Sequence, residues 1–223
     1  MSQDMIIGII FLVILIIVWA GFTLQGRSKN KKEEYVVVKE EYKTKEVIID
    51  GALGIIWGDN RNSVNEKMKS KFYTQINDQT PQPATAEITY SGRFADEPAE
   101  VLVRFFKDAV YEIEIMIKPA DLVGMIAVPV MQETLRQMKK KYGLFNETTD
   151  LWMMMYKTKT PNDFLIRTWR GKTSNGDQAS IIYLPIVHDT VIFTATALLL
   201  IYSDDTMGKV ANEYRIHTKY DGL

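Results

Sequence analysis

The sequence predicts an α+β protein in which one N-terminal transmembrane helix precedes a domain with two short helices packed on a largely antiparallel β-sheet. Three observations lead to this fold class. An uncharged stretch near the N-terminus has the length of a membrane span, two later stretches carry apolar residues at helical spacing, and several stretches alternate with the period of a strand. We divide the chain into a tail and anchor (1–24), a charged tether (25–50), an α+β domain (51–205) and a polar C-terminal tail (206–223).

The apolar stretch runs from Met5 to Leu24 without one ionisable side chain. At about 1.5 Å per residue it spans the roughly 30 Å hydrocarbon layer of a bilayer. Trp19 and Phe22 lie toward its end, where aromatic rings favour the boundary between lipid and water. The alternatives are a cleavable signal peptide, which would need a basic N-terminal region, and a buried helix, which would normally carry a polar stripe. The stretch therefore predicts a permanent membrane anchor.

The residues that follow the anchor predict its orientation. Basic side chains are retained on the cytoplasmic side of a membrane, and they occur here only after the span. This flank places the C-terminal domain in the cytoplasm, and it can also contact anionic lipid headgroups. The basic flank consists of Arg27, Lys29, Lys31 and Lys32.

Composition bounds the class of function. The chain has 223 residues, of which 46% are hydrophobic, enough for one sizeable core. Its 27 basic and 28 acidic side chains nearly balance, which argues against general nucleic-acid binding. There is no cysteine, so disulfides, thiolate metal sites and cysteine nucleophiles are excluded. We predict no cofactor.

Two helices are predicted within the domain. The first begins after Asn60, whose side chain can accept a hydrogen bond from a free amide, and ends near Tyr73. The second begins at Pro129, where proline is tolerated, and Gly143 can cap its end. The apolar faces are Val64, Met68 and Phe72 in the first helix, and Met131, Leu135, Met138 and Tyr142 in the second.

Strands are predicted on both sides of the second helix. A polar loop with Pro81 and Pro83 precedes the first three, and their alternation fits a sheet covered on one side. The last strand is strongly apolar, but its 13 residues are too few for a second membrane span. A polar hairpin turn is expected at 170–176. The predicted strands are 86–90, 101–105, 111–117, 151–157, 164–170, 179–184 and 190–202.

Three quoted stretches together resemble a known kind of domain. They are "GIIWGDNRNSVNEKM", "YSGRFADEPAEVLVRFFKDAVYEIEI" and "KKYG". Over residues 51–205 the chain is similar to small bacterial α+β domains of the SmpA/OmlA and β-lactamase-inhibitor-protein-like kind. The resemblance implies short helices on an antiparallel meander and association with a membrane. It also implies a domain outside the cytoplasm, so a periplasmic or extracellular side stays open, and the lipidated cysteine of the lipoprotein members is missing here.

Few residues have the spacing of a catalytic site. Glu112 and Glu114 would share one strand face, where they can bind a cation or act on a substrate, or simply meet solvent. His188 lies beside Asp189 and can form an acid–base pair, although a turn between two strands is the simpler reading. No pair of histidines has the spacing of a zinc site.

A methionine-rich stretch, "LWMMMY", provides a candidate interaction face. Alternation would place Trp152, Met154 and Tyr156 on one side of a strand. Flexible methionine side chains adapt to apolar partners, although ordinary core packing explains the same pattern.

These observations together predict a membrane-anchored, non-catalytic binding or scaffolding module. Its partners would be the lipid bilayer and a protein bound through the sheet or the methionine-rich strand. The alternatives are a membrane-tethered enzyme with an unrecognised site around Glu112, Glu114 or His188, and a structural component of the cell envelope.

Overall fold

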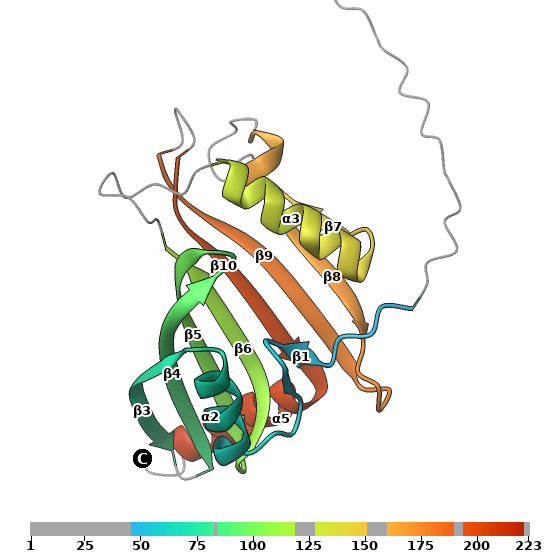
Figure 1. Ribbon diagram of the computed structural model, residues 1–223. Helices are drawn as coiled ribbons and strands as arrows, with labels where there is room; N and C mark the ends of the chain where they lie inside the picture. The colour runs from blue at the N-terminus through green and yellow to red at the C-terminus, as the bar shows by residue number, and fades with distance from the viewer. Residues whose placement is uncertain (1–45, 83, 119–127, 151–159, 190–193, 221–223) are drawn as a thin grey trace, which may run out of the picture. The chain divides into compact units, whose positions relative to one another are not determined.

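A computed structural model of the chain describes residues 46–82, 84–118, 128–150, 160–189 and 194–220. They belong to one compact unit, Thr44–Leu223. A single antiparallel sheet runs through this unit in the order β3-β4-β5-β6-β10-β9-β8-β7, with helices packed on it (Figure 1). The predicted α+β class and the largely antiparallel sheet are confirmed.

The sheet consists of two four-strand meanders that meet where β6 pairs antiparallel with β10. A helix precedes each meander, so the two halves repeat the same order of elements. The first half holds α2 (Arg61–Ser70), β3 (Thr74–Gln82), β4 (Thr85–Phe94), β5 (Glu97–Phe106) and β6 (Ala109–Ile117). The second holds α3 (Val128–Tyr142), β7 (Glu147–Thr149), η1 (Asn162–Phe164), β8 (Ile166–Lys172), β9 (Gln178–Asp189) and β10 (Thr194–Asp204). A small hairpin, β1 (Gly51–Ala52) and β2 (Ile55–Ile56), precedes both halves, and α5 (Asp205–Tyr220) follows them.

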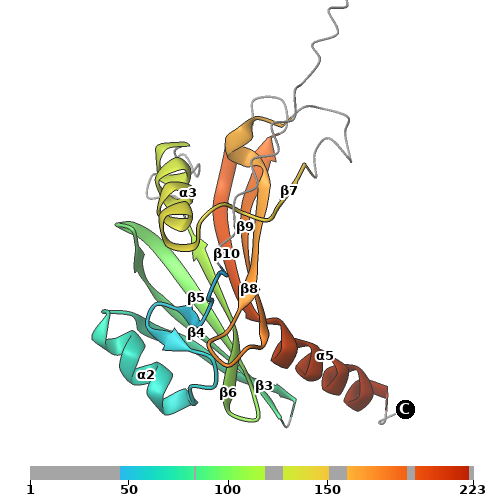
Figure 2. The same ribbon diagram turned by 90° about the vertical axis from the view of Figure 1, so that its right-hand side faces the viewer.

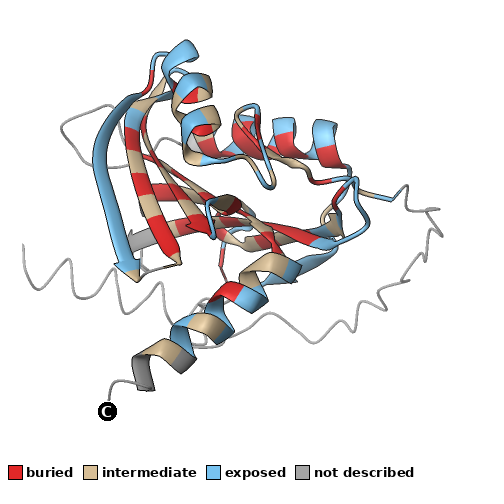
Figure 3. Cartoon of the chain, turned by 90° about the horizontal axis from the view of Figure 1, so that it is seen from below, coloured by how far each residue is buried: buried red, intermediate tan, exposed pale blue. Residues whose placement is uncertain are grey.

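The helices divide between the two faces of the sheet. α2 and α3 lie on one side and α5 on the other (Figure 2). The main core fills the space beneath α2 and α3, where the inward side chains of the central strands are fully buried. Buried and half-buried residues alternate along these strands (Figure 3), as expected when successive side chains point to opposite faces.

Helix α2 forms where its sequence signals predict. The side chain of Asn60 accepts a hydrogen bond from the Ser63 amide at 2.9 Å, which satisfies a free donor of the first turn. Val64 and Met68 are buried. The prediction was wrong for Phe72, which is 93% exposed, because the helix ends at Ser70 and the backbone of Phe72 turns to a positive φ of 63°.

Helix α3 is also confirmed. Its four predicted apolar side chains are all buried against the sheet. Gly143 follows the helix with a φ of 78°, a left-handed conformation that glycine adopts without the steric cost of a Cβ atom. The Gly143 amide donates to the Lys139 carbonyl at 2.9 Å and so closes the last turn.

Two segments that were predicted to be irregular are regular elements. The polar stretch around Pro81 is strand β3, which pairs with β4 at the edge of the sheet. It shows no alternation because nearly all its side chains are exposed, and an edge strand tolerates proline. The described part of the predicted tail 206–223 is helical and belongs to α5, Asp205–Tyr220. Met207, Ala211 and Tyr214 recur at helical spacing and pack on Phe106 and Tyr111 in a second, smaller cluster.

The folded unit also begins earlier than the predicted boundary at residue 51. Ile49 is fully buried, and its amide donates to the Lys172 carbonyl at 2.8 Å. The Lys172 amide in turn donates to the Val47 carbonyl at 2.9 Å, so the chain joins β8 before it reaches β1. A Cβ atom on Gly171 would meet the Val47 carbonyl oxygen at 2.1 Å, and this close approach requires glycine.

No helix among the described residues is long and apolar enough to cross a membrane. The predicted anchor 5–24 and its basic flank lie outside the described residues, as does the methionine-rich stretch 151–157 with Trp152, Met154 and Tyr156. These assignments stay predictions.

Candidate functional site

The most distinctive surface of the described part of the chain is the sheet face opposite α2 and α3, which we name the open face. Helix α5 packs at one end of it, through Phe106 and Tyr111. Residues that lie directly opposite each other in neighbouring strands point to the same face, so the strand register fixes which side chains share it. The register arranges the open face in rows that run across the strands.

An acidic row lies nearest to α5. Glu87 of β4 is opposite Arg104 of β5, which is opposite Glu112 of β6. Ser203 of β10 continues the row, and Ser180 of β9 follows it.

Two aliphatic rows come next. The first contains Leu102, Glu114, Ile201 and Ile182 in successive strands. The second contains Glu100, Met116, Leu199 and Leu184. The six apolar members of these rows are half-buried, and none belongs to either of the two hydrophobic clusters that the described residues form. They make a continuous apolar band over four central strands.

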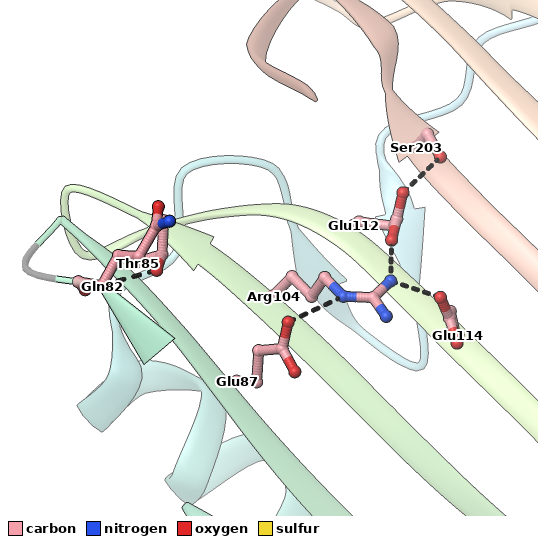
Figure 4. A network of polar contacts seen from close by, with 7 residues as sticks. All are labelled: Gln82, Thr85, Glu87, Arg104, Glu112, Glu114 and Ser203. Carbon is pink, nitrogen blue, oxygen red and sulfur yellow. Dashed lines mark hydrogen bonds and ion pairs between the residues drawn. The ribbon is translucent and has the colours of Figure 1, made fainter. Parts of the chain in front are cut away.

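Arg104 joins the acidic row to the first aliphatic row (Figure 4). Its Nε atom lies 3.2 Å from a carboxylate oxygen of Glu87, and its Nη1 atom contacts both Glu112 and Glu114. The Ser203 hydroxyl donates to the second oxygen of Glu112 at 3.4 Å. All four charged side chains are between 21% and 26% exposed, so they sit in the surface of the sheet rather than projecting into water.

The balance of burial and charge determines how this network titrates. Burial raises the pKa of Glu112 above its ordinary value, and the neighbouring Arg104 only partly opposes this rise. For Arg104 burial acts to lower the pKa, but the contacts with Glu114 and Glu112 outweigh it and raise the pKa. The guanidinium therefore stays charged, and one positive charge faces three carboxylates.

The raised pKa of Glu112 makes the stability of the domain depend on pH. The folded state binds a proton at Glu112 more readily than the unfolded state does, so this contribution favours folding at low pH and is lost as pH rises from about 4.5 through the higher folded pKa. Glu112→Gln removes the titration. We expect the difference in free energy of unfolding, wild type minus Glu112→Gln, to increase as pH is lowered through this window. Urea unfolding of both proteins at a series of pH values measures this difference. Parallel pH curves for the two proteins would contradict the assignment.

The structure brings together two of the predicted catalytic candidates and separates the third. Glu112 and Glu114 share the open face as predicted, but both are engaged by Arg104. The backbone of His188 lies in β9, not in a turn, and it is eight residues beyond Ser180, roughly 26 Å along the strand from the acidic row. The described residues contain no group of three or more side chains suited to hold a metal ion.

Sequence reasoning missed the role of Arg104 and the extent of the apolar band. Arg104 was visible only as a polar residue between apolar neighbours, and a single sequence does not reveal which glutamates lie opposite it. A comparison of the chain with protein-family models, with curated proteins and with solved structures finds no match. The site is therefore interpreted from its own geometry.

Proposed function

We propose that the protein is a membrane-anchored, non-catalytic binding module whose binding surface is the open face. The observation that carries this proposal is the apolar band of six half-buried aliphatic side chains that lies outside both hydrophobic clusters of the described residues. A contiguous apolar patch on a folded domain commonly marks an interaction site. The band is framed by charged side chains, as the apolar centre of a protein interface is framed by a polar rim.

The network around Arg104 favours binding over acid–base catalysis. A general acid or base needs a carboxyl group that is free to exchange a proton with a substrate. Arg104 instead holds Glu112 and Glu114 in fixed positions beside the apolar band. Side chains fixed in this way offer a preorganised acidic edge to a partner.

The membrane part of the proposal rests on the sequence of residues 5–24, whose length and lack of charge fit a single span. The basic flank supports a cytoplasmic domain, and the resemblance to lipoprotein-associated domains supports the opposite side. An anchored domain would meet its partner near the membrane surface.

The test uses the full-length chain in its native membrane. We expect the protein to resist extraction with alkaline carbonate, and a variant lacking residues 5–24 to be released, because the apolar stretch supplies the attachment. A photoreactive amino acid at Leu199, in the apolar band, should form adducts with a bound macromolecule. The same residue at Ile56, which is 52% exposed on β2, serves as the matched control.

Two results would contradict the proposal. Release of the intact chain by carbonate would contradict the predicted membrane anchor. In the same vesicles, protease accessibility of the domain measures on which side of the membrane it lies. Equal adduct yields at Leu199 and Ile56 would contradict the assignment of the open face as the binding surface.

A further inference from the structure

We propose that the macromolecule bound by the open face is a second copy of this chain, packed face to face about a two-fold axis that runs across the strands. This inference rests on the proposed function, because it names the partner of the same surface. Two observations support it: the open face has a fourth row, which is basic, and the charge and polarity of the four rows are complementary between two facing copies.

The fourth row is basic and lies beyond the second aliphatic row. Arg93 of β4 is opposite Pro98 of β5, and the amide of Lys118 donates to the Pro98 carbonyl at 2.8 Å, which places Lys118 in the same row. Both basic residues alternate with inward-facing neighbours, so they share the open face. By their predominant side chains the four rows read acidic, aliphatic, aliphatic and basic, with Glu114 and Glu100 standing within the two aliphatic rows.

When a second copy of the face is turned end to end and laid on the first, the acidic row of each copy lies on the basic row of the other. A two-fold axis across the strands, midway between the aliphatic rows, places each strand antiparallel over the same strand of the second copy. Within its own chain Lys118 pairs with Glu100, and Arg104 pairs with Glu87 and Glu112. In the dimer Glu112 lies over Lys118 of the second copy and Glu87 lies over Arg93, so each basic side chain gains a further carboxylate.

On β10 and β9 the two aliphatic rows pack on each other, with Ile201 over Leu199 and Ile182 over Leu184. On β6 and β5 the carboxylates of Glu114 and Glu100 lie over Met116 and Leu102 of the second copy. Because the operation is symmetric, each of these contacts occurs twice.

The reversed arrangement also separates the two copies of helix α5. Each α5 packs at the acidic end of its own sheet, through Phe106 and Tyr111. The axis puts these ends on opposite sides of the interface, so the two helices flank the paired sheets. The sheets can then approach to about 10 Å, the spacing of packed sheets.

The size of the face suits a stable dimer. Five strands about 4.8 Å apart and four rows about 6.7 Å apart cover roughly 640 Å² per copy, or about 1,300 Å² for the pair. Specific, stable protein interfaces bury about 1,200–2,000 Å² in total. A bilayer is a poorer occupant, because surfaces that insert into lipid carry aromatic side chains beside lysine and arginine, whereas the described side chains of the band are aliphatic and its nearer edge is acidic.

The chain allows a direct test because it contains no cysteine. Leu199→Cys introduces a single thiol beside the proposed axis, where two copies come within reach of a short bis-maleimide. In native membranes the full-length variant should give a crosslinked species of twice the chain mass. Ile56→Cys is the matched control, and it should stay monomeric because β2 lies on the helix side of the sheet.

The second measurement is the dissociation constant of the dimer in lipid nanodiscs or vesicles of defined protein density. Leu199→Lys places two charges in the apolar band of the dimer and should weaken association by at least about a hundredfold. Lys118→Glu should weaken it by about tenfold, and Lys118→Arg should keep it. Ile56→Lys should have no effect, and circular dichroism melting of each variant checks that the domain is folded.

The outcomes separate this inference from the proposed function. A wild-type chain that stays monomeric at every protein density, or a dimer that Leu199→Lys leaves intact, overturns the second-copy proposal. Adducts from Leu199→Cys to a different protein also overturn it, but they support the binding function of the open face. Absence of adducts from both the bis-maleimide at Leu199→Cys and the photoreactive amino acid at Leu199 overturns both.

Discussion

Replacing Trp169 with alanine is expected to lower the free energy of unfolding of the domain by about 3–5 kcal/mol. Trp169 lies on β8 and is fully buried. Its indole nitrogen donates to the Gly143 carbonyl at 3.0 Å, and its ring packs edge-on against Phe145 with 5.9 Å between ring centroids. The change therefore leaves a large cavity and loosens the end of α3 from the sheet.

Urea unfolding of the full-length chain in detergent, followed by circular dichroism, measures this effect. Trp169→Phe keeps most of the ring and loses the hydrogen bond, so it should cost less than half as much. Ile76→Ala is the surface control, because Ile76 is 55% exposed on β3, and it should change the free energy by less than about 0.5 kcal/mol. A Trp169→Ala variant as stable as this control would show that the α3–sheet core is assembled differently.

The second large effect is expected from Arg104→Met, which should cost about 2–3 kcal/mol at pH 7. Among the described residues, Arg104 is the only positive charge in contact with Glu87, Glu112 and Glu114, so its removal leaves three carboxylates close together. The value lies below that of a fully buried ion pair, because these side chains keep some contact with water.

The pH dependence distinguishes charge repulsion from lost packing. Burial raises the pKa of Glu112, so protonation of this carboxylate as pH is lowered relieves part of the repulsion, and Arg104→Met should cost less at pH 4 than at pH 7. Arg136→Met is the matched control, since Arg136 pairs with Glu133 on the exposed side of α3 and should contribute little. An equal cost of Arg104→Met at pH 4 and pH 7 would assign the effect to packing alone.

The parts of the fold that follow from local patterns were predictable. The alternation of β5 and β6, the cap of α2 and the apolar face of α3 are each contained within a few residues, and each is confirmed. The apolar positions of α5 were present too, but a stretch of mixed polarity after Asp205 was read as a tail. The resemblance to SmpA/OmlA-like domains stays a prediction, because no comparison bears on it.

Features that depend on register were not predictable. A single sequence shows that Arg104 and Glu112 face away from the core, but only the pairing of β5 with β6 puts them opposite each other. The same holds for Arg167 on β8, which alternation does not distinguish from a surface residue. It is almost fully buried, and its guanidinium donates to the carbonyls of Leu165 and Asn162 at 2.6 Å.

The junction of β6 and β10 sets the order in which this sheet can assemble. Within each meander consecutive strands are joined by connections of at most 16 residues, whereas the contact between Glu112 and Ser203 joins positions 91 residues apart. Closing so long a loop loses conformational entropy before the contacts across the junction can compensate for that loss. We therefore expect the two meanders to form before they pair with each other, and the rate-limiting barrier to lie at the formation of the β6–β10 junction.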